Sequence, residues 1–176
     1  MIAPPDHREE AAPIIITALL GKEDFAHFDG LRRAHFPPER NQLAAHLTMF
    51  HHLMPSLEAE IRQRLADETR RVPAPAARVV GLISLGRGTA FRIESLDLEM
   101  IRARLAAAFA TLLLPQDAAP WRPHITVQNK VPPADAKALT MALQADFRPR
   151  PLAIAGLAAW WYRGGPWALI SRHMFR

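Results

Sequence analysis

The sequence predicts an α+β protein built from two similar lobes. First, the pattern His-apolar-Thr-apolar occurs at residues 46–49 and again at residues 124–127. Second, each pattern is followed by the same predicted order of elements, namely helix, strand, tight turn and strand. We therefore expect a single domain over residues 1–176 with an internal pseudo-repeat, at about 45–95 and 123–175. A pseudo-twofold relation would make the two motif strands face each other across a cleft.

The elements of the first half are predicted by apolar periodicity and by turn residues. Residues 1–12 are polar and interrupted by prolines, which predicts a loose N-terminal arm. An apolar run follows and indicates a buried strand, and then Phe25, Phe28 and Leu31 recur at the spacing of an amphipathic helix. Prolines within residues 36–41 end this helix. The expected elements are a strand 13–20, a helix 22–34, the motif strand 45–50, a helix 55–71, a strand 78–85, a turn 86–88 and a strand 89–94.

The second half shows a similar alternation of periodic segments and turn residues. Pro132 and Pro133 mark a helix start, because proline suits the first helical turn. Gly164 and Gly165 indicate a tight turn between two apolar strands. The expected elements are a helix 98–114, a loop 115–123, the motif strand 124–131, a helix 134–146, a strand 151–162 and a strand 167–175.

Composition indicates a globular chain without covalent cross-links. The chain has 176 residues, of which 49% are hydrophobic, enough for one domain with its own core. No apolar run approaches the roughly 18 residues that indicate a membrane-spanning helix, and the start lacks the pattern of a signal peptide. The absence of cysteine excludes disulfides, thiolate chemistry and cysteine-based zinc sites. We therefore expect a cytoplasmic monomer, with no membrane and no obligate protein partner.

The charge balance favours an anionic partner. The chain has 22 Lys and Arg against 17 Asp and Glu, a net charge of +5, and almost all of its basic residues are Arg. The planar guanidinium matches phosphate geometry and stays charged, so RNA or a nucleotide is the expected partner. The alternative is a genome rich in G and C, which raises Arg, Ala and Pro together.

The motif residues suit acid–base chemistry at phosphorus. Side chains alternate along a strand, so His46 and Thr48 share one face of their strand, as do His124 and Thr126. Imidazole both accepts and donates protons near neutral pH, and displacement at a phosphodiester needs one group of each kind on opposite sides of phosphorus. Threonine hydroxyls can donate to the non-bridging oxygens. This scheme requires neither a metal nor a cofactor.

Both motifs together resemble the signature of the 2H phosphoesterase superfamily, the 2'-5' RNA ligase and cyclic phosphodiesterase group. The resemblance covers about residues 14–175 and includes the flanks of both motifs. It implies a two-lobed, duplicated α+β fold in which antiparallel sheets face each other across a central cleft, with helices packed outside. By this resemblance His46 and His124 are the general base and acid, in an order that the sequence leaves open, and Thr48 and Thr126 hold the phosphate.

The resemblance also implies a substrate class. Members act on 2',3'-cyclic phosphates, on other cyclic nucleotides or on 2'-5' linkages, typically without a metal. The expected activity is hydrolysis of a 2',3'-cyclic phosphate at an RNA end or on a nucleotide to a 2'-phosphate, with reversible 2'-5' RNA ligation by the same groups.

Further substrate-binding residues are predicted from strand alternation and from position. Alternation places Phe50 with His46, where its ring could stack on a base, and Gln128 with His124, where it could contact the substrate. Two arginines, Arg40 and Arg122, lie in the loops that lead into the motif strands and could bind phosphate. One face of the strand at 151–162 carries aromatic residues that either pack in the core or form a base platform.

Two alternatives remain at this stage. The chain could be an RNA- or nucleotide-binding module of the same fold without significant catalysis, in which case binding would survive loss of both histidines. It could also be a metal-dependent hydrolase that uses His46, His51 and His52, in which case EDTA would abolish activity.

Overall fold

The structure is a computed structural model that describes residues 12–176. The predicted N-terminal arm therefore lies, apart from Ala12, outside the described residues. Within the described part of the chain, no helix is both long enough and apolar enough to cross a membrane.

Within residues 12–176, seven antiparallel strands form the centre of the structure. Six of them follow the order β2-β1-β6-β3-β4-β5, and β7 pairs with β6. The α+β class with antiparallel sheets and helices, predicted from the sequence, is confirmed. The strands are β1 (Ile14–Leu20), β2 (Leu47–Leu53), β3 (Ala76–Ser84), β4 (Thr89–Glu94), β5 (His124–Gln128), β6 (Arg150–Trp161) and β7 (Ala168–Met174).

The long strand β6 belongs to two sheets at once. Its residues 154–161 pair with β1 and, from Gly156 onward, with β7, whereas residues 150–153 pair with β3. One sheet is therefore β2-β1-β6-β7 and the other is β6-β3-β4-β5. In both sheets the motif strand, β2 or β5, lies at an edge, and these two edge strands contact each other.

The strand pairing crosses between the two halves of the chain. Setting the short helices aside, the order strand-helix-strand-helix-strand occurs twice, from β1 to β3 and from β4 to β6. The third strand of each series pairs with the first strand of the other series, because β3 pairs with β4 and β6 pairs with β1. This phase differs from the pseudo-repeat proposed from the sequence, which began at each motif strand. The duplication itself stays a prediction.

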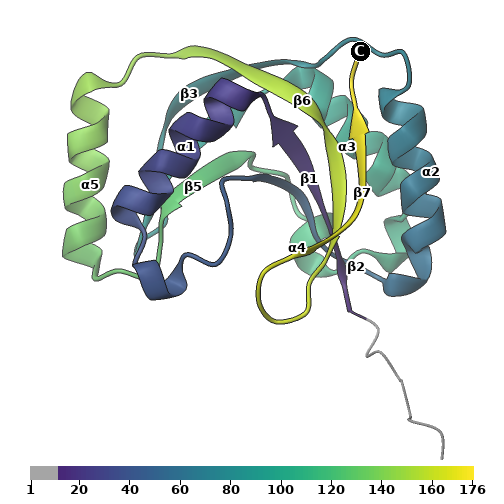
Figure 1. Ribbon diagram of the computed structural model, residues 1–176, viewed down its shortest axis with the longest axis horizontal. Coiled ribbons are helices and arrows are strands. Elements are labelled where there is room, and N and C mark those ends of the chain that lie inside the picture. Colours follow the sequence, from purple (N-terminus) through teal and green to yellow (C-terminus); the bar gives the residue numbers. More distant parts are fainter. Residues whose placement is uncertain (1–11) are drawn as a thin grey trace, which may run out of the picture.

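In the described part of the chain, five α-helices cover these strands. Helices α2 and α5 lie on opposite flanks of the molecule (Figure 1), with α2 on β6 and β7 and α5 on β3 and β4. Helix α3 packs on β3, α1 contacts β5, and α4 contacts β2. The first and fourth helices thus touch the motif strand of the other half. The bounds are α1 (Lys22–His35), α2 (Glu58–Thr69), α3 (Leu96–Ala108), α4 (Pro115–Ala118) and α5 (Pro133–Asp146).

Helix starts and ends follow local chemistry. Ser95 caps α3, since its side chain accepts a hydrogen bond from the Leu98 amide at 3.1 Å and donates to the Ala76 carbonyl at 2.7 Å. The cap therefore also joins α3 to β3. Helix α3 ends at Ala108, earlier than the predicted 114, and a 3-10 turn at Ala110–Leu112 follows it.

A single hydrophobic core joins both halves. Phe28 of α1 packs edge-on against Phe91 of β4, with ring centroids 5.2 Å apart. Phe50 of β2 and Phe109, which follows α3, are almost completely buried in the same cluster. Because each half contributes aromatic side chains to one core, the motif strands are held by packing as well as by sheet pairing.

Candidate active site

The two motifs occupy equivalent positions in their strands. His46 immediately precedes β2, and His124 is the first residue of β5. In each motif the histidine and the threonine are partly exposed, while the apolar residues between and after them are buried. The predicted alternation of faces therefore holds over the four residues of each motif.

Both histidines are anchored in the same way. The Nδ1 atom of His46 lies 2.7 Å from the Ala44 carbonyl, and Nδ1 of His124 lies 2.7 Å from the Arg122 carbonyl. A carbonyl oxygen only accepts hydrogen bonds, so Nδ1 carries the proton in both rings. In the neutral form of each histidine, Nε2 is then the unprotonated nitrogen and the one that can exchange a proton with a substrate.

His46 lies in an environment that disfavours its charged form. Burial, followed by the nearby charges of Arg32, His124 and His51, lowers the pKa of His46 to about 4, although the Ala44 carbonyl acts in the opposite direction. The Trp167 ring contributes to this burial, with its centroid 4.7 Å from that of the imidazole. His46 is therefore neutral at pH 7, and His124 lies near enough for its charge to act on His46.

Two buried arginines tie the motif strands to the opposite halves. Arg32 of α1 donates through Nη1 to the Thr126 carbonyl of β5 at 2.9 Å and through Nε to the Leu43 carbonyl at 3.1 Å. Arg102 of α3 donates through Nε to the Met49 carbonyl of β2 at 2.8 Å. Arg32 is 3% exposed and Arg102 is 8% exposed, so both guanidinium groups form these hydrogen bonds in the protein interior.

Backbone groups at the outer edge of β2 form hydrogen bonds with side chains from the second half of the chain. The indole nitrogen of Trp121 donates to the Thr48 carbonyl at 3.0 Å. The Asp117 carboxylate accepts hydrogen bonds from the backbone amides of His51 and His52 at 2.8 and 2.9 Å. An unpaired strand edge invites pairing with another chain, and here polar side chains occupy it instead.

Asp117 also determines the position of the His51 ring. The Nδ1 atom of His51 lies 3.1 Å from a carboxylate oxygen of Asp117. Burial by itself raises the pKa of Asp117, but the hydrogen bonds from His51 and His52 outweigh burial and hold that pKa below its usual value. Within residues 12–176, no group of three His, Cys, Asp or Glu side chains is arranged to hold a metal ion, so the geometry gives no support to the metal alternative.

Both motif strands carry a bulge directly after the threonine. Opposite β1, Thr48 and Phe50 pair with consecutive residues, which leaves Met49 as the extra residue. Opposite β4, Thr126 and Gln128 pair with consecutive residues, which leaves Val127 as the extra residue. A bulge shifts the alternation of faces by one position, so the residues that follow it point to the other side.

These bulges overturn two predicted placements. Phe50 is 0% exposed and belongs to the core, where the Arg102 guanidinium lies 4.7 Å from its ring centroid. Gln128 is 6% exposed and its Oε1 atom is buried without a hydrogen-bond partner. The prediction that Phe50 stacks on a base is therefore wrong, because its ring has no exposed face. Strict alternation also placed Gln128 on the open face beside His124, and the structure shows that its side chain is buried instead.

The two loop arginines predicted to bind phosphate are exposed. Arg40 ends the 3-10 turn Pro38–Arg40, and Arg122 precedes the second motif strand, where its carbonyl anchors His124. No hydrogen bond or ion pair within the described residues fixes either guanidinium near the motif. Their role in phosphate binding stays a prediction.

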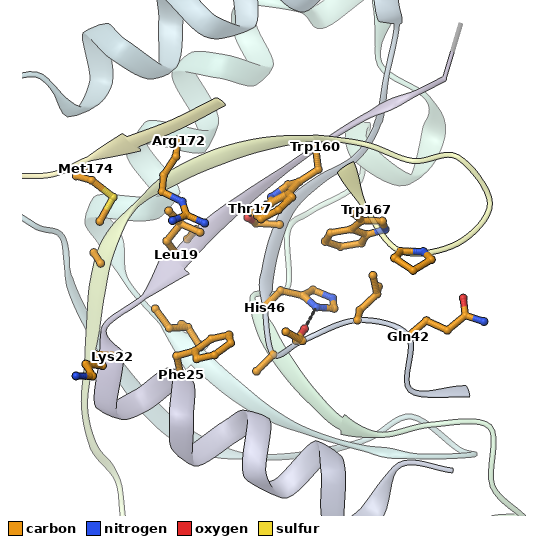
Figure 2. Close-up of a pocket in the computed structure, with 17 residues that line it drawn as sticks. Thr17, Leu19, Lys22, Phe25, Gln42, His46, Trp160, Trp167, Arg172 and Met174 are labelled. Carbon is orange, nitrogen blue, oxygen red and sulfur yellow. Dashed lines mark hydrogen bonds between the residues drawn. The ribbon is translucent and has the colours of Figure 1, made fainter. Parts of the chain in front are cut away.

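A large cavity adjoins His46. Its volume is about 710 Å³, and its lining is mostly apolar (Figure 2). Trp160 faces this cavity and donates from its indole nitrogen to the Thr17 hydroxyl at 2.9 Å, whereas Trp161 packs against the core. This decides between the two faces of the aromatic strand that the sequence left open. Other side chains that line the cavity are Lys22, Phe25, Trp167, Arg172 and Met174.

Several residues of this site escape sequence reasoning. Arg32 and Arg102 are cations within helices and resemble solvated residues, because only the distant strands they contact bury them. Asp117 lies in a segment predicted to be a loop. Trp167 follows the Gly-Gly-Pro turn, and this aromatic residue beside a turn is the one local signal that could have suggested a role.

Most of the chain matches one known protein family. The profile of the 2'-5' RNA ligase superfamily matches residues 21–166 of the chain. The chain belongs to the 2'-5' RNA ligase superfamily. This match confirms the 2H phosphoesterase resemblance seen in the two motifs, and it includes both motifs and the helices that hold them. No curated protein matches the sequence.

Several solved structures share the fold of this chain. The protein TT0787 of Thermus thermophilus is similar with a TM-score of 0.62 and 16% identity, over 93% of this chain and 98% of that one. Escherichia coli LigT, crystallised with NADP+, has a TM-score of 0.61 and 16% identity, over 94% and 99%. A structure described as a phosphoesterase has a TM-score of 0.59 and 18% identity, over 94% and 99%. At such identities these likenesses establish the fold.

Proposed function

We propose that the protein is a metal-independent phosphodiesterase that opens 2',3'-cyclic phosphates of RNA ends or nucleotides by two-histidine acid–base catalysis. The observation that carries this proposal is the matched anchoring of His46 and His124. Both rings donate through Nδ1 to the carbonyl two residues earlier, at 2.7 Å, which leaves Nε2 of each for proton exchange. Membership of the 2'-5' RNA ligase superfamily supports the substrate class.

We assign His46 as the general base. Its pKa of about 4 makes it neutral at pH 7, so its Nε2 atom can take the proton of an attacking water molecule. As the new bond to phosphorus forms, the bond from phosphorus to the ribose 3'-oxygen breaks. In this step His124 must start in its protonated form, with a proton on each ring nitrogen. It donates the Nε2 proton to that leaving oxygen, and the product is a 2'-phosphate.

The two motif threonines would hold the phosphate. Thr48 and Thr126 are partly exposed and lie on the same side of their strands as the histidines. Their hydroxyls would donate to the non-bridging oxygens, whose negative charge persists through the reaction. Replacing either by Val keeps the shape and removes the donor, so Thr→Val should lower kcat whereas Thr→Ser should retain most of it.

Solved relatives are compatible with a nucleotide substrate. Escherichia coli LigT has been crystallised with 3'-AMP, with ATP and with phosphate as well as with NADP+. The surplus of Arg over acidic residues in this chain would also favour a phosphate-bearing partner. A cytoplasmic location and a monomeric state complete the proposal.

The decisive experiment is hydrolysis of the four nucleoside 2',3'-cyclic monophosphates in the presence of EDTA. The wild-type protein should form 2'-phosphates, and His46→Ala and His124→Ala should each lower kcat by about 10²–10⁴-fold, the usual contribution of one acid–base group. Equal rates in the wild type and both variants would reject this site. Loss of activity in EDTA, restored by a divalent cation, would reject metal independence.

A binding module without catalysis is the second candidate. It predicts no turnover by the wild type, together with affinity for RNA ends that survives the double substitution His46→Ala, His124→Ala. Measuring RNA binding by both proteins separates the two functions.

A further inference from the structure

Strand β7 has an outer edge that is open along most of its length. Among the strands of residues 12–176, β2, β5 and β7 each pair with a single neighbour. Side chains of the opposite half bind outer backbone groups of the other two edges, namely Arg102, Asp117 and Trp121 on β2 and Arg32 on β5. Within the described residues, no side chain forms a hydrogen bond with the backbone of β7. This edge therefore lacks the protection that the other two have.

The backbone at the end of β7 shows which side is open. The Phe175 amide donates to the Ala155 carbonyl of β6 at 3.0 Å, toward the sheet. The next amide, that of Arg176, points the other way and donates to the Val72 carbonyl, in the segment after α2, at 2.9 Å. The chain therefore places a backbone partner of its own against this edge, but only at Arg176.

The same alternation continues back along β7. In an antiparallel pair, residues that bond to the neighbouring strand alternate with residues whose N–H and C=O point away from it. The pairing of β7 with β6 is regular from Ser171 to Met174, so Arg172 and Met174 have the orientation of Arg176. Both residues are exposed, and their outward groups bind no other part of residues 12–176. An extended segment of another chain could pair with them as an added strand.

The neighbouring elements leave this edge accessible. Helix α2 contacts both β6 and β7, so it covers one face of the sheet rather than its edge. The side chains of Arg172 and Met174 line the cavity on the other face (Figure 2). Met174 is 52% exposed and Leu169 is 49% exposed, so apolar side chains accompany the open backbone groups. The edge therefore has both the backbone groups and the apolar surface that strand addition uses.

The borders of this edge are strongly basic. Residues 70–75 and 162–176 contain no Asp or Glu, and their arginines are Arg70, Arg71, Arg163, Arg172 and Arg176. All of these arginines are exposed, and none forms an ion pair with an acidic residue of the described chain. A segment that carries Asp or Glu would complement this edge. A second copy of the chain would instead bring the same arginines and be repelled.

We propose that the outer edge of β7 binds an extended acidic segment of a partner protein, which adds a strand to the first sheet beside Arg172 and Met174. Main-chain hydrogen bonds would provide the affinity, and Asp or Glu side chains beside the arginines would provide the selectivity. Such binding uses neither motif histidine and is therefore independent of the proposed function.

The test selects ligands for the full-length protein from a phage-displayed library of random decapeptides. We expect the enriched peptides to be rich in Asp, Glu and β-branched residues. In NMR hydrogen exchange, a synthetic copy of an enriched peptide should slow exchange of the Arg172 and Met174 amides by roughly tenfold or more, because these amides gain a hydrogen bond. Exchange of the Ser171 and His173 amides, which point toward β6, should change much less.

A substitution at Met174 tests the same contact. Met174→Pro removes one outward amide, and proline is tolerated where a strand amide faces away from its neighbour. We expect it to weaken peptide binding by roughly five- to tenfold, the effect of one lost hydrogen bond. Met174→Ala keeps the amide and is the matched control, which should bind almost as tightly as the wild type. Thermal unfolding shows whether both variants fold, and exchange in the wild-type protein decides the case if they do not.

Three outcomes would overturn the inference. Failure to enrich any peptide, or enrichment of basic peptides, would exclude the acidic partner. Unchanged exchange of the Arg172 and Met174 amides in a saturated complex would show that the peptide binds elsewhere. Self-association that rises with protein concentration and protects the same amides without peptide would show that a second copy occupies the edge.

Discussion

Arg32 and Arg102 each donate a hydrogen bond to the motif strand of the opposite half of the chain. Arg32, from the first half, donates to the Thr126 carbonyl in the second motif strand at 2.9 Å. Arg102, from the second half, donates to the Met49 carbonyl in the first motif strand at 2.8 Å. Each motif strand is therefore held by a buried cation of the other half, within three residues of its histidine. The spacing of the two histidines depends on these contacts as well as on the sheets.

Removing Arg102 should destabilise the protein far more than removing an exposed arginine of the same helix. Arg102→Met leaves the Met49 and Asp117 carbonyls without their donor, so the free energy of unfolding should fall by about 2–5 kcal/mol. Arg104 pairs with Glu68 at the surface, and Arg104→Met should cost at most about 1 kcal/mol. Urea unfolding of both variants measures the difference, and equal losses would contradict the structural role of Arg102.

His46 should titrate well below a normal histidine. Its pKa of about 4 arises mainly from burial, so the acidic limb of kcat/KM should lie near pH 4, with the base active above it. Trp167→Ala opens one side of the ring and should move the pKa upward, toward 6.5. NMR titration of the His46 ring gives both values directly. A wild-type pKa near 6.5 would show that burial does not control the pKa of His46. The control is Leu169→Ala, at an exposed site of β7, which should leave that pKa unchanged.

The same shift predicts a pH dependence of stability. Between pH 6.5 and about 4, His46 of the unfolded chain binds a proton that the folded protein excludes. The free energy of unfolding should therefore decrease as the pH falls through this window. His46→Asn should flatten that part of the curve relative to the wild type. A curve of unchanged slope would mean that His46 binds protons equally in the folded and unfolded states.

Asp117 should be required for the outer edge of β2. Asp117→Asn replaces one acceptor oxygen by a donor that faces the amides of His51 and His52, at an expected cost of about 2–4 kcal/mol. Because its folded pKa is lowered, the carboxylate stabilises the protein above the usual value of 3.8 and this contribution is lost as the pH falls below it. Thermal unfolding of Asp117→Asn beside Asp146→Asn, an exposed site at the end of α5, tests the prediction. A similar Tm for the two variants would refute it.

Phe50 should affect folding rather than substrate binding. Its ring is fully buried, so Phe50→Ala should lower the free energy of unfolding by about 3–5 kcal/mol. KM measured on the folded fraction should change little, because the ring does not reach the site face. A raised KM with unchanged stability would instead restore the base-stacking role that strand alternation predicts.

Local patterns were sufficient to predict most elements and the four motif side chains. The apolar run that forms β1, the two prolines that begin α5 and the turn before β4 all act over a few residues. The structure has each of these elements within a few positions of its predicted ends. The motif faces follow from alternation alone. The exchange of β3 and β6 between the halves was not predictable, since it depends on pairings between distant strands.

The two bulges were not predictable from the local sequence. Nothing in residues 46–50 or 124–128 differs from a regular strand, yet pairing with β1 and β4 inserts Met49 and Val127 as extra residues. Phe50 and Gln128 are therefore buried instead of facing the site. The burial of Arg32 was not predictable for a similar reason, because it depends on the position of β5 and of the segment before β2 in the folded structure.

The shared strand β6 has a consequence for synthesis on the ribosome. Strand β1 needs β6 as a neighbour, yet β6 spans Arg150–Trp161 and emerges long after β1 at Ile14–Leu20. The first sheet therefore cannot close while only the first half of the chain has been made. Nascent β1 and β2 must remain unpaired with β6 until nearly the whole chain has been translated, so both lobes are completed together at the end of translation.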